Sequence, residues 1–254
     1  LPRSLLPQTR RSSPIIRPGL TRPITPAPAP PAGITRRSAP EADYGGIDFA
    51  ALGAAQGDLV TAQKIAVAGC YNDWASGAAR VAVDGWTTDA DYYVKIYAPV
   101  SERHDGRAKD EADNYTGFTI CDTLNWSSAV EVYEPYTKVE GIVVDLNGCS
   151  DCAGFYTDFL ATNCVITNAI AFNSSALGNA FEIRGVQTTL INCVGYKAAA
   201  AFAATGTGSN SKFYKCSAVD CTTGYSLALG NGYVLTNCLA EGNTDNFNVA
   251  AGTV

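Results

Sequence analysis

A cysteine-anchored repeat in the second half of the chain limits the possible folds more than any other feature of the sequence. The segments ATNCVITN, LINCVGYK, FYKCSAVD and LTNCLAEG place Cys164, Cys193, Cys216 and Cys238 at spacings of 29, 23 and 22 residues. Short β-prone stretches and Gly or Asn turns lie between them. A period of about 22 residues with this composition is typical of a parallel β-helix, in which each repeat is one coil of short strands.

Equivalent residues of successive coils should stack in columns, at the strand spacing of about 4.8 Å. We expect the cysteines to form a compact apolar ladder, the asparagines a hydrogen-bonded ladder at a bend, and the aromatic residues a column inside the coil. The predicted ladder residues are Cys164, Cys193, Cys216, Cys238, Asn163, Asn192, Asn237, Phe202, Tyr225 and Phe247. Phe181 follows Cys164 by 17 residues instead of nine, which predicts an insertion of about eight residues at AFNSSALG.

The earlier part of the body fits the same architecture less regularly. Residues 92–99, 129–135 and 139–148 are predicted strands followed by turn residues. Residues 47–69 are expected to include a short helix that caps the first coil, which otherwise exposes strand edges. No comparable segment follows Gly252, so we expect a neighbouring molecule to cover the last coil.

The N-terminal segment differs from the body in composition and charge. Ten of the twelve prolines lie in residues 1–40, and seven arginines but no acid lie there, giving +7, whereas residues 41–254 carry −13. The prolines predict an extended arm over residues 1–43, ahead of a β-helix domain over 44–254. We expect the arm to lie on an acidic protein surface, the capsid protein or a neighbouring subunit, through Arg3, Arg10, Arg11, Arg17, Arg22, Arg36 and Arg37.

Nucleic acid and membranes are not expected partners. The arm has no aromatic residue that could stack on bases, and the chain has no run of 18 apolar residues.

Residues 44–254, with their NC repeats, resemble the right-handed parallel β-helix proteins of the pectate-lyase-like architecture. The stretch VAVDGWTTDADYYVKIYAPVSERHDG, residues 81–106, is similar to a first-coil segment of β-helix proteins in tailed-bacteriophage virions. The resemblance implies an all-β, right-handed parallel β-helix in a virion protein, with trimers as the expected oligomer.

Catalytic and metal sites are not expected. A glycosidase needs two carboxyl groups about 5 to 9 Å apart, and the columns that continue from Glu182 and Arg184 toward the C-terminus stack no carboxylates. Asp145, Asp151 and Asp158 lie close in sequence, but turn and solvent roles are expected for them. The CxxC of Cys149 and Cys152 lacks two further zinc ligands, so the nine cysteines are interpreted as structural, with no cofactor.

Two other features carry weaker signals. His104, the single histidine, lies in the charged segment SERHDGRAKDEAD and is interpreted as a solvated loop residue rather than a general base. A sugar-stacking face is conceivable but packing roles are expected for the aromatic residues Trp74, Trp86, Trp126, Tyr92, Tyr93, Tyr97, Tyr133 and Tyr136.

These observations predict a non-enzymatic structural protein, a decoration or cement protein on the capsid surface of a tailed phage, anchored by its arm. Two alternatives stay open. One is a carbohydrate-binding or carbohydrate-cleaving β-helix, either tailspike-like or secreted, which requires a groove with clustered acids. The other is a filament or surface-layer subunit linked by arm exchange.

Overall fold

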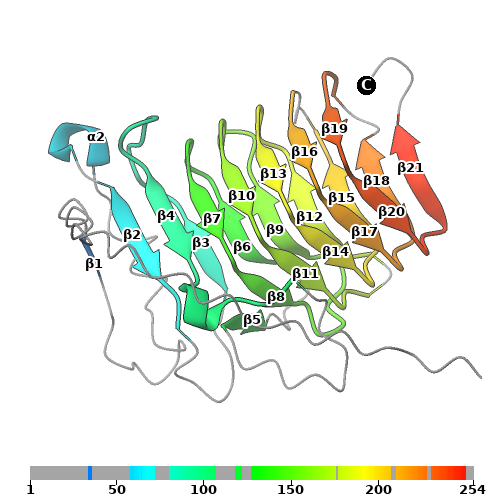
Figure 1. Cartoon of the computed structure of the whole chain (residues 1–254). Coiled ribbons are helices and arrows are strands. Elements are labelled where there is room, and N and C mark those ends of the chain that lie inside the picture. The colour runs from blue at the N-terminus through cyan, green and yellow to red at the C-terminus, as the bar shows by residue number, and fades with distance from the viewer. Residues whose placement is uncertain are drawn as a thin grey trace, which may run out of the picture. The chain divides into compact units, whose positions relative to one another are not determined.

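The structure, a computed structural model, describes residues 34–35, 58–63, 65–71, 80–106, 118–121, 127–175, 177–206, 210–227 and 230–249. These residues form the predicted all-β parallel β-helix (Figure 1). Each coil of the regular part passes through three sheets in turn, and every strand pairs in parallel with strands of the neighbouring coils. The predicted fold class is therefore confirmed in the part of the chain that the structure describes.

The three sheets are named here by the order in which a coil passes through them. Sheet 1 contains β1 (Ile34–Thr35), β2 (Ala66–Gly69), β4 (Val94–Tyr97), β7 (Lys138–Glu140), β10 (Val165–Thr167), β13 (Thr189–Ile191), β16 (Lys212–Tyr214) and β19 (Val234–Thr236). Sheet 2 contains β5 (Thr119–Cys121), β8 (Val143–Asp145), β11 (Ile170–Phe172), β14 (Val194–Tyr196), β17 (Ser217–Val219) and β20 (Leu239–Glu241). Sheet 3 contains β3 (Val81–Val83), β6 (Ser128–Val132), β9 (Ala153–Thr157), β12 (Asn179–Ile183), β15 (Ala200–Ala204), β18 (Thr223–Leu227) and β21 (Asp245–Val249).

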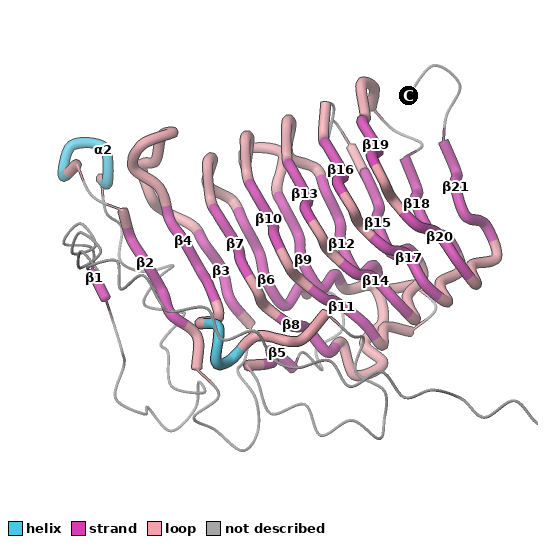
Figure 2. The backbone as a smooth tube through the Cα atoms, in the orientation of Figure 1, coloured by secondary structure: helices cyan, strands magenta, loops and turns pink. Residues whose placement is uncertain are grey.

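Corners between the strands depend on residues that tolerate a left-handed backbone. The corner between sheets 1 and 2 has Asn168, Asn192, Lys215 and Asn237 at φ values of 50° to 54°. Asparagine and glycine adopt this conformation at the lowest cost, which explains why the repeats carry them there. In the predicted strand 139–148, Gly141 at φ 72° makes the same corner and divides the segment into β7 and β8. Figure 2 shows these short loops between successive strands.

Alternation along the strands builds the core inside the coils. In sheet 3 the inward residues form one aromatic column in which each ring stacks on the next at centroid distances of 4.9 to 5.2 Å. The column contains Phe155, Phe181, Phe202, Tyr225 and Phe247. A second, smaller cluster lies on the outward side of sheet 2, where Phe172 stacks on Tyr196 at 4.8 Å.

The predicted places of Cys164 and Asn163 are wrong. Cys164 lies just before β10, at the corner between sheets 3 and 1, whereas Cys193 lies just after β13, at the corner between sheets 1 and 2. Ala169, after Asn168, occupies the position that corresponds to Cys193. The assignment failed because both corners take a left-handed Asn, so an Asn-Cys pair fits either of them.

The predicted insertion lies where it was expected but is shorter. Phe181 pairs with Phe202, as the aromatic column requires. Residues 173–178 connect β11 to β12, whereas residues 197–199 make the same connection one coil later. The insertion is therefore three residues long, and the expected eight came from counting from Cys164.

The N-terminal expectations are described only in part. Within 47–69, α2 (Leu59–Ala62) is a short helix whose first turn is closed by the Asp58 carboxylate, which accepts a hydrogen bond of 2.9 Å from the Thr61 N–H. Residues 47–57 and the predicted boundary at 43–44 lie outside the described residues. No helix among the described residues is long and apolar enough to span a membrane.

Candidate functional site

The arginines predicted to bind a partner all lie outside the described residues: Arg3, Arg10, Arg11, Arg17, Arg22, Arg36 and Arg37. Their role stays a prediction, and the described part of the chain has to be searched for sites by itself. The ladder residues, the outward face of sheet 3, His104 and the CxxC are taken in turn below.

The ladder residues lie at the corners and in the interior. The Asn192 side-chain amide donates a hydrogen bond of 2.8 Å to Oδ1 of Asn168 in the preceding coil. Cys193 and Cys216 are fully buried, and the neighbouring Cys193 side chain raises the pKa of the Cys216 thiol. Thiols with a raised pKa are poor nucleophiles, so this column acts in packing.

A network of charged and aromatic residues covers the outward side of sheet 3. Register places Glu131, Tyr156 and Glu182 in one column on successive coils. Asp158 and Arg184 each follow two residues after a member of that column, and thus form a second outward column beside it. We call these five residues, together with Arg80, Tyr133 and Thr205, the charged face of sheet 3.

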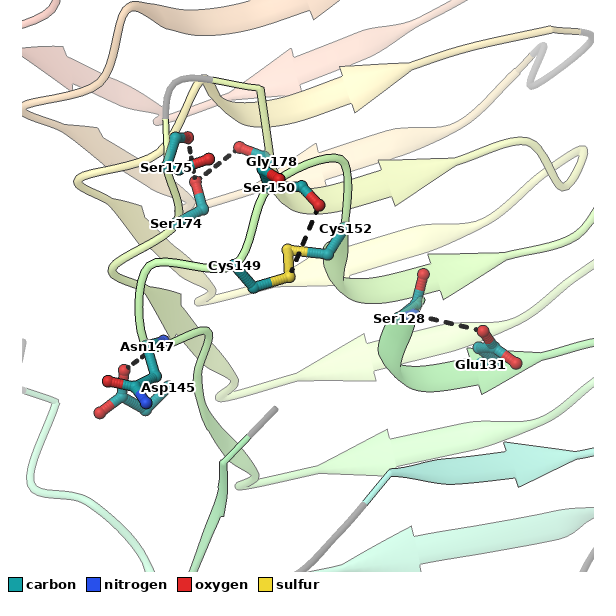
Figure 3. Close-up of a disulfide and its surroundings, with 10 residues drawn as sticks. All are labelled: Ser128, Glu131, Asp145, Asn147, Cys149, Ser150, Cys152, Ser174, Ser175 and Gly178. Atoms are coloured by element: carbon teal, nitrogen blue, oxygen red, sulfur yellow. Dashed lines mark hydrogen bonds between the residues drawn. A yellow bond between two sulfur atoms is a disulfide. The ribbon is translucent and has the colours of Figure 1, made fainter. Parts of the chain in front are cut away.

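Glu131 is the most buried carboxylate of this face. Its Oε2 lies 2.6 Å from Arg80 and accepts a hydrogen bond of 3.3 Å from the Tyr133 hydroxyl. Its Oε1 accepts a bond of 3.2 Å from the Ser128 N–H (Figure 3). With 6% of its surface exposed, Glu131 depends on these partners because an unpaired buried carboxylate is costly.

The middle of the face joins two tyrosines to an acid. The Tyr156 hydroxyl donates a hydrogen bond of 3.1 Å to Asp158, and its ring centroid lies 6.2 Å from that of Tyr133. Burial raises the pKa of Tyr156 to about 12, Arg184 opposes this, and the Asp158 carboxylate adds to the increase. Both tyrosines are therefore uncharged donors at neutral pH.

The C-terminal end of the face is an ion pair between Glu182 and Arg184. The Arg184 guanidinium lies 2.9 Å from Oε1 of Glu182 and 5.3 Å from the ring of Tyr156. The Thr205 hydroxyl donates a further bond of 2.8 Å to the same oxygen. The carboxylate is thus fixed in position by groups from two coils.

The charged face corrects the search for stacked carboxylates. The Glu182 column has no other acid toward the C-terminus, but toward the N-terminus it contains Glu131 two coils away, at a backbone separation of roughly 9.6 Å for two strand spacings. Each of the two carboxylates is held by an arginine. Such a face can present donors, acceptors and ring edges to a polar ligand.

His104 is bound to the β-helix and is not a solvated loop residue. The Gly106 N–H donates a hydrogen bond of 3.0 Å to Nδ1, so Nε2 carries the proton and donates a bond of 2.6 Å to the Asn168 carbonyl. Burial lowers the pKa of His104, although the Asn168 carbonyl and Asp105 favour the charged ring. The neutral imidazole fastens residues 103–106 to the corner at Asn168.

Cys149 and Cys152 are joined in a disulfide at the corner between β8 and β9 (Figure 3). The Cys149 carbonyl accepts a hydrogen bond of 2.9 Å from Ser175, and the Cys152 carbonyl one of 2.8 Å from Asn179, so the disulfide corner is tied to the next coil. Among the described residues, no cluster of three or more His, Cys, Asp or Glu side chains could hold a metal ion.

The remaining predicted residues are dispersed. Asp145 accepts hydrogen bonds from Asn147 and Asn173 at a corner of sheet 2, far in the coil from Asp158. Among the aromatic residues, Trp86 is buried and Tyr93 lies under Lys138, whose Nζ is 3.5 Å from the ring centroid. Trp74 and Trp126 lie outside the described residues.

Comparison with protein-family models, with curated proteins and with solved structures found no match to this chain. The arguments about function therefore rest on the residues themselves.

Sequence reasoning missed the charged face because the coils that carry it differ in length from the later ones. Glu131, Tyr156 and Glu182 follow at 25 and 26 residues, whereas the next member of the column, Ala203, follows at 21. The signal that could have found it is the pair of dipeptides Phe155-Tyr156 and Phe181-Glu182, which place an aromatic residue of the inner column beside each outward residue.

Proposed function

We propose that the protein is a non-catalytic structural component, an acidic β-helix body that a basic N-terminal arm holds on an acidic protein surface. The observation that carries the proposal is the division of charge, +7 in residues 1–40 and −13 in the rest of the chain. Extended segments rich in arginine bind carboxylates through paired hydrogen bonds. The parallel β-helix supplies a stiff body, because its backbone bonds are satisfied coil by coil.

The surface that we propose for the arm is the shell of a tailed-phage virion, with the protein as a decoration or cement protein. The resemblance of residues 81–106 to virion β-helix proteins supports this choice. A non-catalytic role is supported by Glu131 and Glu182, whose carboxylates are committed to arginines rather than left free to exchange protons.

The test compares the full chain with a variant lacking residues 1–40 and with one in which the seven arm arginines are replaced by glutamine. Each is mixed with purified virions that lack the protein and sedimented with them. The full chain should cosediment, and both variants should stay in solution while keeping the circular-dichroism spectrum of the body. Decoration by either variant at the full-chain level contradicts the proposal.

A second candidate, binding of a polysaccharide, is favoured by the charged face of sheet 3. Partly exposed tyrosines beside fixed carboxylates are the groups that recognise sugar rings and hydroxyls. Calorimetry with neutral and acidic polysaccharides tests it on the full chain, on Tyr133→Ala and on Tyr214→Ala, a control on the outward face of sheet 1. Equal binding by the two variants, or none by the full chain, removes this candidate.

A further inference from the structure

The last coil of the β-helix exposes residues whose equivalents one coil earlier are completely buried. Tyr225 has no exposed surface, whereas Phe247, its successor in the aromatic column, is 53% exposed. The same change occurs in the other inward columns of this end. Leu235, Cys238, Ala240 and Val249 are only partly buried, while Phe213, Cys216, Ala218 and Leu227 before them are 0% exposed.

The backbone at this end is also unpaired. β19, β20 and β21 are the terminal strands of the three sheets, and no described strand lies beyond them (Figure 1). Free strand edges next to an exposed apolar surface are a template for pairing with another chain. The first strands of the β-helix are different, because Val81 and Val83 of β3 have no exposed surface.

This difference between the ends identifies the partner surface. An apolar end gains most from contact with another apolar end. The opposite end of a second molecule exposes no comparable core residues among those described, so head-to-tail stacking has little to bury. The matching surface is the same end of a second copy, and an end that binds itself does so around a twofold axis.

We infer that two copies of this chain associate through their last coils, with the twofold axis at the centre of β21. Phe247 is the central residue of Asp245–Val249. Antiparallel pairing of β21 with its copy therefore sets Phe247 opposite the second copy's Phe247, at a strand spacing of about 4.8 Å. The aromatic column, with rings 4.9 and 5.2 Å apart in its last two steps, then continues through the interface.

The same axis separates the acids of the last coil. Residues 230–249 contain Glu241 and Asp245 and no Lys or Arg, so a contact that set them face to face would be repulsive. Antiparallel pairing about Phe247 places Asp245 opposite Val249 of the second copy. It also turns β20, which ends at Glu241, toward the second copy's β19, which is uncharged.

Sedimentation velocity of the full chain over a concentration series tests the contact. The chain should form dimers and no larger species at about 100 μM, where a contact of micromolar affinity is largely occupied. Phe247→Asp should be monomeric. Phe159→Asp is the matched control, because Phe159 is 59% exposed on the corner after sheet 3 and should leave the dimer unchanged. A monomeric full chain, an open series, or dimers of Phe247→Asp overturn the inference.

A second variant keeps the test decisive if Phe247→Asp folds poorly. In Phe247→Cys the twofold axis sets the new thiol beside its own copy, and a dithiol-oxidising diazene such as diamide converts the pair to a disulfide, the two thiol protons and two electrons reducing the diazene to a hydrazine. Val249→Cys, which faces Asp245 of the second copy, should cross-link no more than the full chain. Equal cross-linking by both variants contradicts the twofold arrangement. This contact does not depend on what the arm binds, so its failure leaves the proposed function untouched.

Discussion

The ring of Phe202 stacks on that of Tyr225 at a centroid distance of 4.9 Å, and both residues are fully buried. Their column ends at Phe247, which covers Tyr225 on one side and is itself half exposed. Position in the column should therefore set what each ring contributes to stability.

Truncation within this column should follow burial. Phe202→Ala should lower the free energy of unfolding by about 3–5 kcal/mol, because it removes a buried ring and leaves a cavity. In the monomeric protein Phe247→Ala should cost only about 1–2 kcal/mol, since half of its surface is already in water. Chemical denaturation of both variants at low protein concentration measures this, and equal losses would contradict the stacking account.

The corner at Asn192 should depend on backbone conformation more than on the side chain. Asn192→Ala should lower the free energy of unfolding by about 1–2 kcal/mol, because alanine is strained at φ 54° and cannot bond to Asn168. Asn192→Gly loses the same hydrogen bond without the strain, and should cost less than about 1 kcal/mol. Denaturation curves showing glycine to be the worse substitution would argue against a left-handed corner.

His104 should make stability depend on pH in a narrow window. Its folded pKa is lowered while the unfolded value is about 6.5, so the unfolded chain binds the proton more readily. The stabilisation is complete above pH 6.5 and is lost as the pH falls through the folded pKa. Thermal unfolding between pH 7.5 and 5.5 should show a decline that His104→Gln, which keeps a donor for the Asn168 carbonyl, reduces. Because His104 is the single histidine, identical slopes would contradict this role.

Removing the disulfide should have a modest effect. Cys149 and Cys152 are three residues apart, and closing so short a loop restrains little of the unfolded chain. The double variant Cys149→Ala/Cys152→Ala should lose about 1–2 kcal/mol of unfolding free energy. Reduction of the full chain should give a similar loss, measured by denaturation with and without reductant. Complete unfolding on reduction would show that the corner carries more of the fold than this.

The fold was predictable because it repeats. The spacing of Cys193, Cys216 and Cys238 and the aromatic residues nine positions later mark coils that must stack in register. The exact column of Cys164 was not predictable, because two corners of a coil make the same demand for a left-handed Asn. Burial, not the repeat, decides which of the two corners a given Asn-Cys pair occupies.

The charged face of sheet 3 was beyond the sequence for a related reason. Its acids come together only when coils of unequal length are aligned, and the loop residues that change the length carry no sign of it. His104 likewise contacts Asn168, 64 residues away, through a segment that leaves the regular coil. Contacts of this kind follow from the path of the chain rather than from a local pattern.

The central claim is that the basic arm holds the acidic β-helix on a virion shell. The most direct measurement is cryo-electron microscopy of intact virions that carry the protein, at a resolution that identifies what residues 1–40 contact. We predict that the arm lies on the shell protein, with its arginines against carboxylates. An arm that lies on another copy of this chain in an open series, or one that contacts no shell protein, would contradict the claim.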